Sequence, residues 1–392
     1  MNARTIHPFP ARMAPDIAID RLSSPSAGHR LQVLDPMCGS GTVLTSAVAH
    51  GHHAQGFDMD PLAVLMSRVA TQAVDLESVR SCAEYVVEKS RSSALSAPRW
   101  NDAETIRFAE YWFAKDQRIQ LTRLSVEIEG IEDSSTRQAL EVALSRIIVT
   151  KSPKASLAAD TSHSRPHRVI DSSDFDVYKG FLSSVAALTR RLEARAIVGC
   201  ATVSRGDARS MEIASNSVDL VITSPPYLNA IDYLRGHRLA LIWLGHTIPE
   251  LRKIRSDSIG AERALGSSPL AAVVEMVALI EDSVTDAEKL PKSIITRYAQ
   301  DLAVFAHEIY RVVRPGAKVV TVIGNSTLRG NYIQNDLLVR RAYEFAGFRI
   351  TSRTERDLPE NRRYMPVRAS HGQSPIDKRM RTEVIVDAEK CA

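Results

Sequence analysis

The chain has 392 residues, of which 44% are hydrophobic, enough for one large domain with insertions or for two modest domains. Its 50 Lys and Arg against 46 Asp and Glu give a net charge of only +4, so any nucleic-acid surface must come from local clustering and not from global charge. There is no apolar run long enough to span a membrane, no signal-peptide core and no metal or disulfide pattern in the four cysteines, so we expect a cytoplasmic protein without a bound metal.

The first predicted elements form a strand, a glycine-rich turn and a helix. Residues 31–34 are predicted as a strand and 43–49 as a helix, and the turn between them is Asp35-Pro36-Met37-Cys38-Gly39-Ser40-Gly41-Thr42. Glycines let backbone N–H groups come close to a ligand, and the start of a helix favours a negative group. The turn lacks the Lys of a phosphate-binding loop and the full dinucleotide fingerprint, so it indicates a different ligand.

A second predicted strand, 54–57, ends in Asp58-Met59-Asp60-Pro61. An acid about 20 positions after a glycine turn can hold ribose hydroxyls. The alternative is an ordinary strand, turn and helix that happens to end in an acid. The pairing of Asp35 with Asp58 favours a nucleoside carrying a compact anionic tail.

From about residue 74 to 149 the pattern is helical. Leu140, Ala143 and Leu144 follow helical spacing after Ser134-Ser135, which we expect to cap that helix. The aromatic run 111–113 fits a helix-packing core better than a base-stacking surface.

A third strand near 196–203 ends close to Asp207, and a fourth, 218–222, runs directly into Ser224-Pro225-Pro226-Tyr227. Two prolines stiffen this turn and remove two backbone donors, so its carbonyl oxygens can face a ligand. A flat ring with an exocyclic amine would stack on Tyr227 and donate hydrogen bonds to Ser224 and to the Pro225 carbonyl. The alternative is a proline-rich strand end that only closes a turn.

The remaining pattern is a helical excursion over 238–315, a buried strand at 318–323, a helix near 336–345 and a final pair of strands at 349–354 and 383–386. Alternating strands and helices predict an α/β fold with a mainly parallel, doubly wound sheet.

Together these motifs resemble the S-adenosylmethionine-dependent amino-group DNA methyltransferases. The resemblance implies a Rossmann-like fold with a mainly parallel seven-stranded sheet and one antiparallel strand near an edge. It assigns S-adenosyl-L-methionine binding to Phe9, Pro10, Arg12, Asp35, Pro36, Cys38, Gly39, Ser40, Gly41, Thr42, Asp58 and Asp207. It assigns catalysis to Ser224, Pro225, Pro226 and Tyr227.

The long helical run departs from the simplest pattern of this family and suggests a division of the chain. We expect 1–73 to be the N-terminal part of the catalytic domain with the cofactor loop. Residues 74–195 would be a helical insertion and a candidate for DNA recognition, and 196–392 the C-terminal catalytic part with its excursion at 238–315.

The Ser-Pro-Pro-Tyr form is typical of cytosine-N4 enzymes, and Asn229, Asp232 and Tyr233 fit the same pattern. The target amine would then belong to a cytosine flipped out of double-stranded DNA. Three alternatives stay open: an adenine-N6 DNA methyltransferase, an RNA or protein-glutamine methyltransferase, and a non-catalytic binding subunit. A carbon-5 cytosine enzyme is disfavoured because no cysteine follows a proline.

Two basic clusters are candidates for DNA contact. One contains Arg146, Lys151, Lys154, Arg165 and Arg168, and the other contains Arg362 and Arg363 together with Arg353 and Arg356. The alternative for each is a solvated charged surface. A cognate restriction endonuclease is a further candidate partner, and the sequence gives no oligomeric state.

Overall fold

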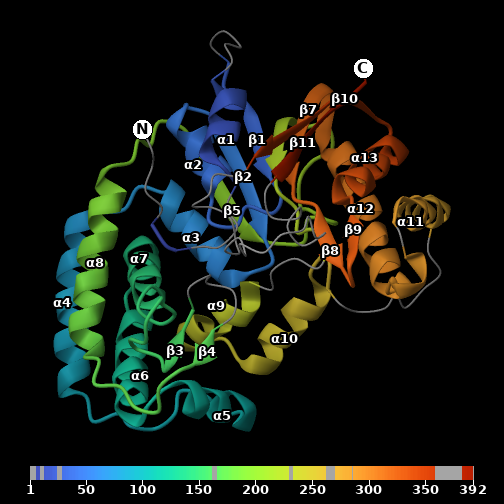
Figure 1. Cartoon of the computed structure of the whole chain (residues 1–392). Helices are drawn as coiled ribbons and strands as arrows, with labels where there is room; N and C mark the ends of the chain where they lie inside the picture. The colour runs from blue at the N-terminus through green and yellow to red at the C-terminus, as the bar shows by residue number, and fades with distance from the viewer. Residues whose placement is uncertain are drawn as a thin grey trace.

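A seven-stranded sheet forms the centre of the molecule (Figure 1). The computed structural model describes residues 6–8, 13–23, 29–160, 166–228, 233–261, 270–284, 286–357 and 382–391. The strands are β1 (Gln32–Asp35), β2 (His53–Asp58), β5 (Cys200–Arg205), β6 (Val218–Thr223), β7 (Val313–Ile323), β10 (Phe348–Asp357) and β11 (Thr382–Lys390). Their order is β10-β11-β7-β6-β1-β2-β5, and β11 runs antiparallel to both of its neighbours. The predicted Rossmann-like α/β fold, with one antiparallel strand next to an edge, is confirmed.

Helices cover both faces of this sheet because its central strands are apolar on both sides. On one face α1 (Pro15–Leu22) and α2 (Thr42–Ala49) pack on Val33, Leu220 and Ile222. On the other, α11 (Ala271–Ser283), α12 (Lys292–Val312) and α13 (Asn335–Ala346) pack on Leu34 and Val221. Successive strand residues thus enter opposite cores, as the two-residue period of a strand requires.

A separate helical core lies below and to the left of the sheet in Figure 1. It is built from α3 (Pro61–Thr71), α4 (Leu76–Ser92), α5 (Ala103–Trp112), α6 (Lys115–Glu129), α7 (Ser134–Ser145) and α8 (Val177–Glu193), with the short pair β3 (Ala158–Ala159) and β4 (His167–Arg168). Residues of α9 (Tyr233–Leu241) and α10 (Ile248–Asp257) are buried in the same core, although they follow the double-proline turn in sequence. The chain after that turn therefore returns to the helical part before it reaches α11.

Several predicted boundaries shift. Asp133, and not Ser134 or Ser135, caps α7, because its carboxylate accepts a hydrogen bond from the Thr136 amide at 2.8 Å. The predicted helical excursion, 238–315, ends at Val312, because β7 already begins at Val313. Gly316, which lies within β7, has a φ of 78°. A small antiparallel pair, β8 (Ser326–Leu328) and β9 (Asn331–Ile333), was not predicted. The aromatic run 111–113 is split: Phe113 is fully buried, as the core interpretation requires, whereas Tyr111 is exposed.

Candidate active site

The glycine turn and the double-proline turn open at the same edge of the sheet. β1 and β6 are parallel neighbours, with Val33 beside Leu220 and Leu34 beside Val221. β2 lies on the other side of β1, and β5 lies beside β2, again in parallel. Because the carboxyl ends of parallel neighbours meet at one edge, the segments that follow β6, β1, β2 and β5 lie next to one another. Asp35, Asp58 and Asp207 end or follow three of these strands.

The glycine turn is shaped by left-handed backbone at two residues. Gly39 and Gly41 have φ values of 51° and 80°. A Cβ on Gly41 would lie 2.9 Å from Ser67 Oγ and 3.2 Å from Ser67 Cα, so α3 packs directly against the turn. The Ser67 hydroxyl donates to the Gly39 carbonyl at 2.8 Å. Among the described residues no side chain caps the start of α2 at Gly41, and the first N–H groups of this helix face no side-chain acceptor there.

Asp58 is held by the glycine turn and by its own loop. The Gly39 amide donates to Asp58 Oδ2 at 2.8 Å, and the Asp60 amide donates to Oδ1 at 2.9 Å. Burial, reinforced by the Asp60 charge, raises the pKa of Asp58 to about 6 despite these two amides. Each carboxylate oxygen can accept a second hydrogen bond, so Asp58 can still bind donors such as ribose hydroxyls.

Asp35, at the end of β1, is buried. Burial raises its pKa to about 7, while the Thr223 hydroxyl and the Met37 amide act in the opposite direction. The neighbouring thiol of Cys38 is also buried, and its pKa is raised well above the ordinary value by burial and by the charges of Asp58 and Asp35. Cys38 is thus a packing residue and not a thiolate nucleophile.

The double-proline turn is fixed by contacts from β7 and α12. The Ser224 hydroxyl donates its proton to the Val322 carbonyl at 2.8 Å, which leaves the oxygen lone pairs of Ser224 to accept from another group. The Pro226 carbonyl accepts from the Tyr298 hydroxyl at 2.9 Å. The Tyr227 ring lies against Gly324, where an added Cβ would be 3.4 Å from the ring.

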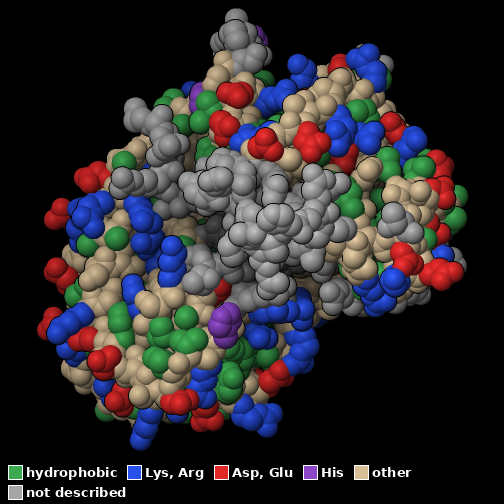
Figure 2. All heavy atoms as spheres, viewed as in Figure 1, with side chains coloured by type: hydrophobic (Ala, Val, Ile, Leu, Met, Phe, Trp, Pro, Cys, Tyr) green, Lys and Arg blue, Asp and Glu red, His purple; other side chains and the backbone are tan. Residues whose placement is uncertain are grey.

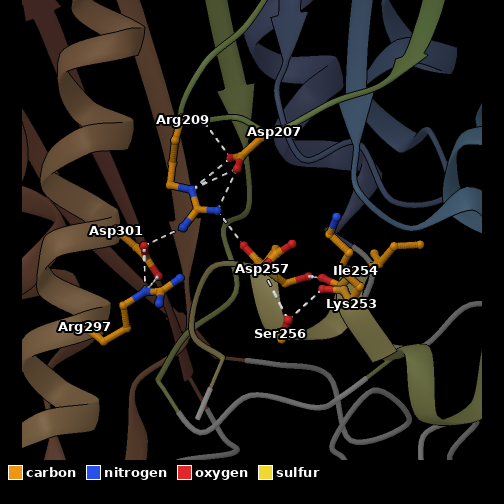
Figure 3. Close-up of polar contacts among 9 residues, drawn as sticks. Asp207, Arg209, Lys253, Ile254, Ser256, Asp257, Arg297 and Asp301 are labelled. Atoms are coloured by element: carbon orange, nitrogen blue, oxygen red, sulfur yellow. Dashed lines mark hydrogen bonds and ion pairs between the residues drawn. The ribbon is translucent and has the colours of Figure 1, made fainter. Parts of the chain in front are cut away.

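The loop after β5 brings Asp207 to the same edge. The Gly206 amide donates to the Asp58 carbonyl at 3.1 Å, and a Cβ on Gly206 would come within 2.7 Å of the Phe57 ring. This contact explains why a glycine precedes Asp207. The Asp207 carboxylate is bound by Arg209 (Figure 3).

Sequence reasoning missed three residues that hold this site: Arg209, Tyr298 and His237. His237 of α9 pairs through Nδ1 with Asp60, and both side chains are buried. That pair ties the loop after Asp58 to the helix that follows the double-proline turn. His237 lies 177 residues from its partner, so only the fold could reveal the contact.

The predicted DNA-contacting residues have different surroundings. Lys151 and Lys154 are exposed. Arg168 stacks over Tyr111, 5.2 Å from the ring centroid, and pairs with Asp171 at 3.1 Å. Figure 2 shows Lys and Arg side chains on the viewed face of the helical part.

Other arginines of the two predicted basic clusters serve the fold. Arg146 points inward and donates to Ser184 and to the Ile6 carbonyl. Arg353 pairs with Asp336, and Arg356 with Asp16 and Glu383. Phe9, Pro10, Arg12, Arg165, Asn229, Asp232, Arg362 and Arg363 lie outside the described residues.

The described residues contain neither a candidate metal site nor a candidate membrane span. No group of three or more His, Cys, Asp or Glu side chains in the described ranges could hold a metal ion. None of the helices that the structure describes has the length and apolar character needed to cross a membrane.

The strand order and the turns at the sheet edge define a Rossmann-like methyltransferase fold. No protein-family model matches the chain. It is 22% identical over 370 residues to the type II methyltransferase M.MvaI of Kocuria varians, covering 86% of this chain and 80% of that protein. It is 22% identical over 361 residues to the type II methyltransferase M.AvaI of Nostoc sp., covering 81% and 73%.

A third relative, the type II methyltransferase M.BsoBI of Geobacillus stearothermophilus, is 29% identical over 167 residues. That match covers 35% of this chain and spans about a third (33%) of the length of M.BsoBI. Among solved structures, an S-adenosylmethionine-dependent methyltransferase from Methanosarcina mazei aligns over 97% of this chain and 99% of its own, with 9% identity and a TM-score of 0.35. The chain is a homologue of type II methyltransferases, and the predicted resemblance is confirmed at that level.

Proposed function

We propose that this protein transfers a methyl group from S-adenosyl-L-methionine to the exocyclic N4 amine of a cytosine that has been flipped out of double-stranded DNA. The observation that carries this proposal is the meeting of the glycine turn and the Ser-Pro-Pro-Tyr turn at the ends of adjacent parallel strands. The type II methyltransferase relatives support the reaction class and make a partner restriction endonuclease a reasonable expectation.

The residues at this edge of the sheet fit the proposed cofactor. Asp58 and Asp207 offer carboxylate oxygens to ribose hydroxyls and to the adenine amine, and buried Asp35 offers a carboxylate to a cationic group. The N–H groups at the start of α2 suit a carboxylate tail. When bound, S-adenosylmethionine supplies an electrophilic methyl group on a sulfonium.

The double-proline turn would activate the target amine. Its nitrogen is a weak nucleophile because its lone pair is delocalised into the ring. Ser224, which already donates its own proton to Val322, would accept a hydrogen bond from the amine, as would the Pro225 carbonyl. These acceptors favour a tetrahedral nitrogen whose lone pair can attack, so positioning and electrostatics supply most of the rate gain. Stacking on Tyr227 would offset the few kcal/mol needed to unstack the base.

The decisive experiment is to identify the methylated base. Plasmid DNA from cells expressing the protein would be digested to nucleosides and analysed by mass spectrometry, with the Ser224→Ala variant as the control. We expect N4-methylcytosine with the wild-type protein and little or none with the variant. N6-methyladenine would redirect the proposal to the adenine-N6 reaction, and the absence of any methylated base from a protein that is folded would contradict it. Mapping the modified positions would then give the recognition sequence.

A further inference from the structure

Arg209 joins three segments of the chain through its guanidinium group (Figure 3). Its Nε and Nη2 donate to the two carboxylate oxygens of Asp207, over distances of 2.6 to 3.1 Å. Its Nη1 donates to Asp301 of α12, and Nη2 also donates to the main-chain carbonyl of Asp257 at the end of α10. Every nitrogen of the guanidinium therefore has an acceptor.

Within the cluster of Asp207, Arg209 and Asp301, only the Asp207 side chain is substantially exposed to a ligand. The side chain of Asp301 is 5% exposed and that of Arg209 is 15% exposed, whereas Asp207 is 32% exposed. Arg297 donates to both oxygens of Asp301, so two arginines balance two acids in this partly buried group. Asp207 can thus accept a further hydrogen bond from a ligand without losing its ion pair.

The contact with Asp257 lies where the chain passes between two cores. α10 buries Leu251 and Ile254 in the helical core, while Ile259, two residues beyond Asp257, is buried in the core under the sheet. The last carbonyls of a helix lack partners within the helix, and a cation is favoured there. Arg209 supplies both a donor and a positive charge at this crossing point.

Building on the proposed function, we infer that Arg209 is a positioning residue that couples cofactor binding to DNA binding. A cofactor that donates a hydrogen bond to Asp207 changes how Arg209 divides its hydrogen bonds between Asp207, Asp301 and the Asp257 carbonyl. It thereby biases the placement of α10 and of the helical core attached to it. By thermodynamic linkage, DNA held by the helical part changes cofactor affinity by the same factor.

The test compares duplex binding with and without saturating S-adenosylhomocysteine, the non-reactive product. Fluorescence anisotropy would give the Kd of a short duplex that carries the mapped recognition sequence. We expect the product to change this Kd at least about fivefold in the wild-type protein, within the usual range of allosteric coupling. The Arg209→Lys variant keeps the charge but cannot donate to three acceptors in one plane. The ratio between the Kd values measured without and with the product should therefore fall below about twofold. Its KM for S-adenosylmethionine should rise by a larger factor than its kcat falls.

Arg311→Lys is the matched control. Arg311 of α12 likewise holds this loop, since it donates to the carbonyls of Met211 and Ile213 and pairs with Glu308, but among the described residues it contacts neither Asp207 nor α10. Its ratio should stay at the wild-type value. If Arg209→Lys does not fold, Asp301→Asn, which removes the buried anchor of Arg209, should lower the ratio in the same way.

The possible failures can be told apart. Normal methylation with an unchanged ratio in both Arg209→Lys and Asp301→Asn would overturn the coupling alone, as would an equal loss in Arg311→Lys. A wild-type ratio of one would also overturn it. If the wild-type protein binds no S-adenosylhomocysteine, the proposed function fails and the coupling fails with it.

Discussion

At the scale of single residues, two carboxyl groups of the proposed cofactor site are harder to ionise than ordinary acids. Burial raises the pKa of Asp35 to about 7 and that of Asp58 to about 6, both from 3.8. Such a group binds its proton more tightly in the folded chain than in the unfolded chain. The free energy of unfolding of the ligand-free protein therefore falls as the pH rises from about 4 through the raised pKa. A ligand that donates hydrogen bonds or brings a positive charge favours the ionised form and reverses part of this cost.

Cofactor binding should therefore strengthen as pH rises. Between pH 5.5 and about 8 we expect the affinity for S-adenosylhomocysteine to increase, by at most tenfold per pH unit for each group that must lose a proton, and to level off above this range. Calorimetry in buffers of different ionisation enthalpy would detect the released protons. In the Asp35→Asn variant the affinity should be weaker, and the change between pH 6.5 and 7.5 should disappear. A wild-type Kd that is constant from pH 5.5 to 8 would remove both acids from the site.

Tyr227 should affect the target base and not the cofactor. Base–aromatic stacking contributes about 1–3 kcal/mol, so Tyr227→Ala should lower kcat/KM for DNA by about 5- to 150-fold. Tyr227→Phe keeps the ring and should retain most activity. The calorimetric Kd of S-adenosylhomocysteine should be unchanged in both variants. Normal turnover of Tyr227→Ala would contradict the stacking role.

At the scale of elements, the glycine turn depends on both backbone conformation and close packing. Gly41 has a φ of 80° and lies against Ser67 of α3, whereas Gly316 has a φ of 78° with nothing within 4 Å of an added Cβ. Left-handed backbone costs an L-residue about 1–2 kcal/mol. Gly316→Ala should lower the free energy of unfolding by about that amount, and Gly41→Ala by more, because α3 must also shift. Urea unfolding measures both. Equal losses would show that the contact with Ser67 does not constrain the turn.

The sequence was informative for elements whose signals are local. Short apolar runs that end in Asp35, Asp58 and Ser224 marked three strand ends, because the glycines, prolines and acids that stop a strand follow it directly. The Arg209–Asp301 pair could not be found in this way, since the two residues are 92 positions apart and meet only through the sheet order. The return of α9 and α10 to the helical core was hidden for the same reason, because their apolar spacing does not say which core buries them.

At the scale of the whole molecule, two contacts between described residues beside the proposed active site join the helical core to the loops of the sheet. The Asp60–His237 pair links the loop after β2 to α9, and Arg209 links the loop after β5 to α10. Both connections involve the chain that follows the Ser-Pro-Pro-Tyr turn. A duplex bound by the helical part would therefore act on the segment that follows the Ser-Pro-Pro-Tyr turn.

This arrangement gives a prediction for the exposed lysines of the helical part. Each phosphate contact contributes about −0.9 to the slope of log K against log salt concentration for duplex DNA. If Lys151 and Lys154 contact phosphates, Lys151→Gln with Lys154→Gln should make the slope shallower by about 1 to 2 and weaken binding to all sequences alike. Arg341→Gln with Arg349→Gln removes the same charge from residues paired with Glu344 and Glu389, and it should leave the slope unchanged. Anisotropy titrations over a range of salt concentrations compare the two double variants. Identical slopes in both would show that these lysines act only through net charge, and the search for the DNA-binding surface would then move to Arg168 and the residues around Tyr111.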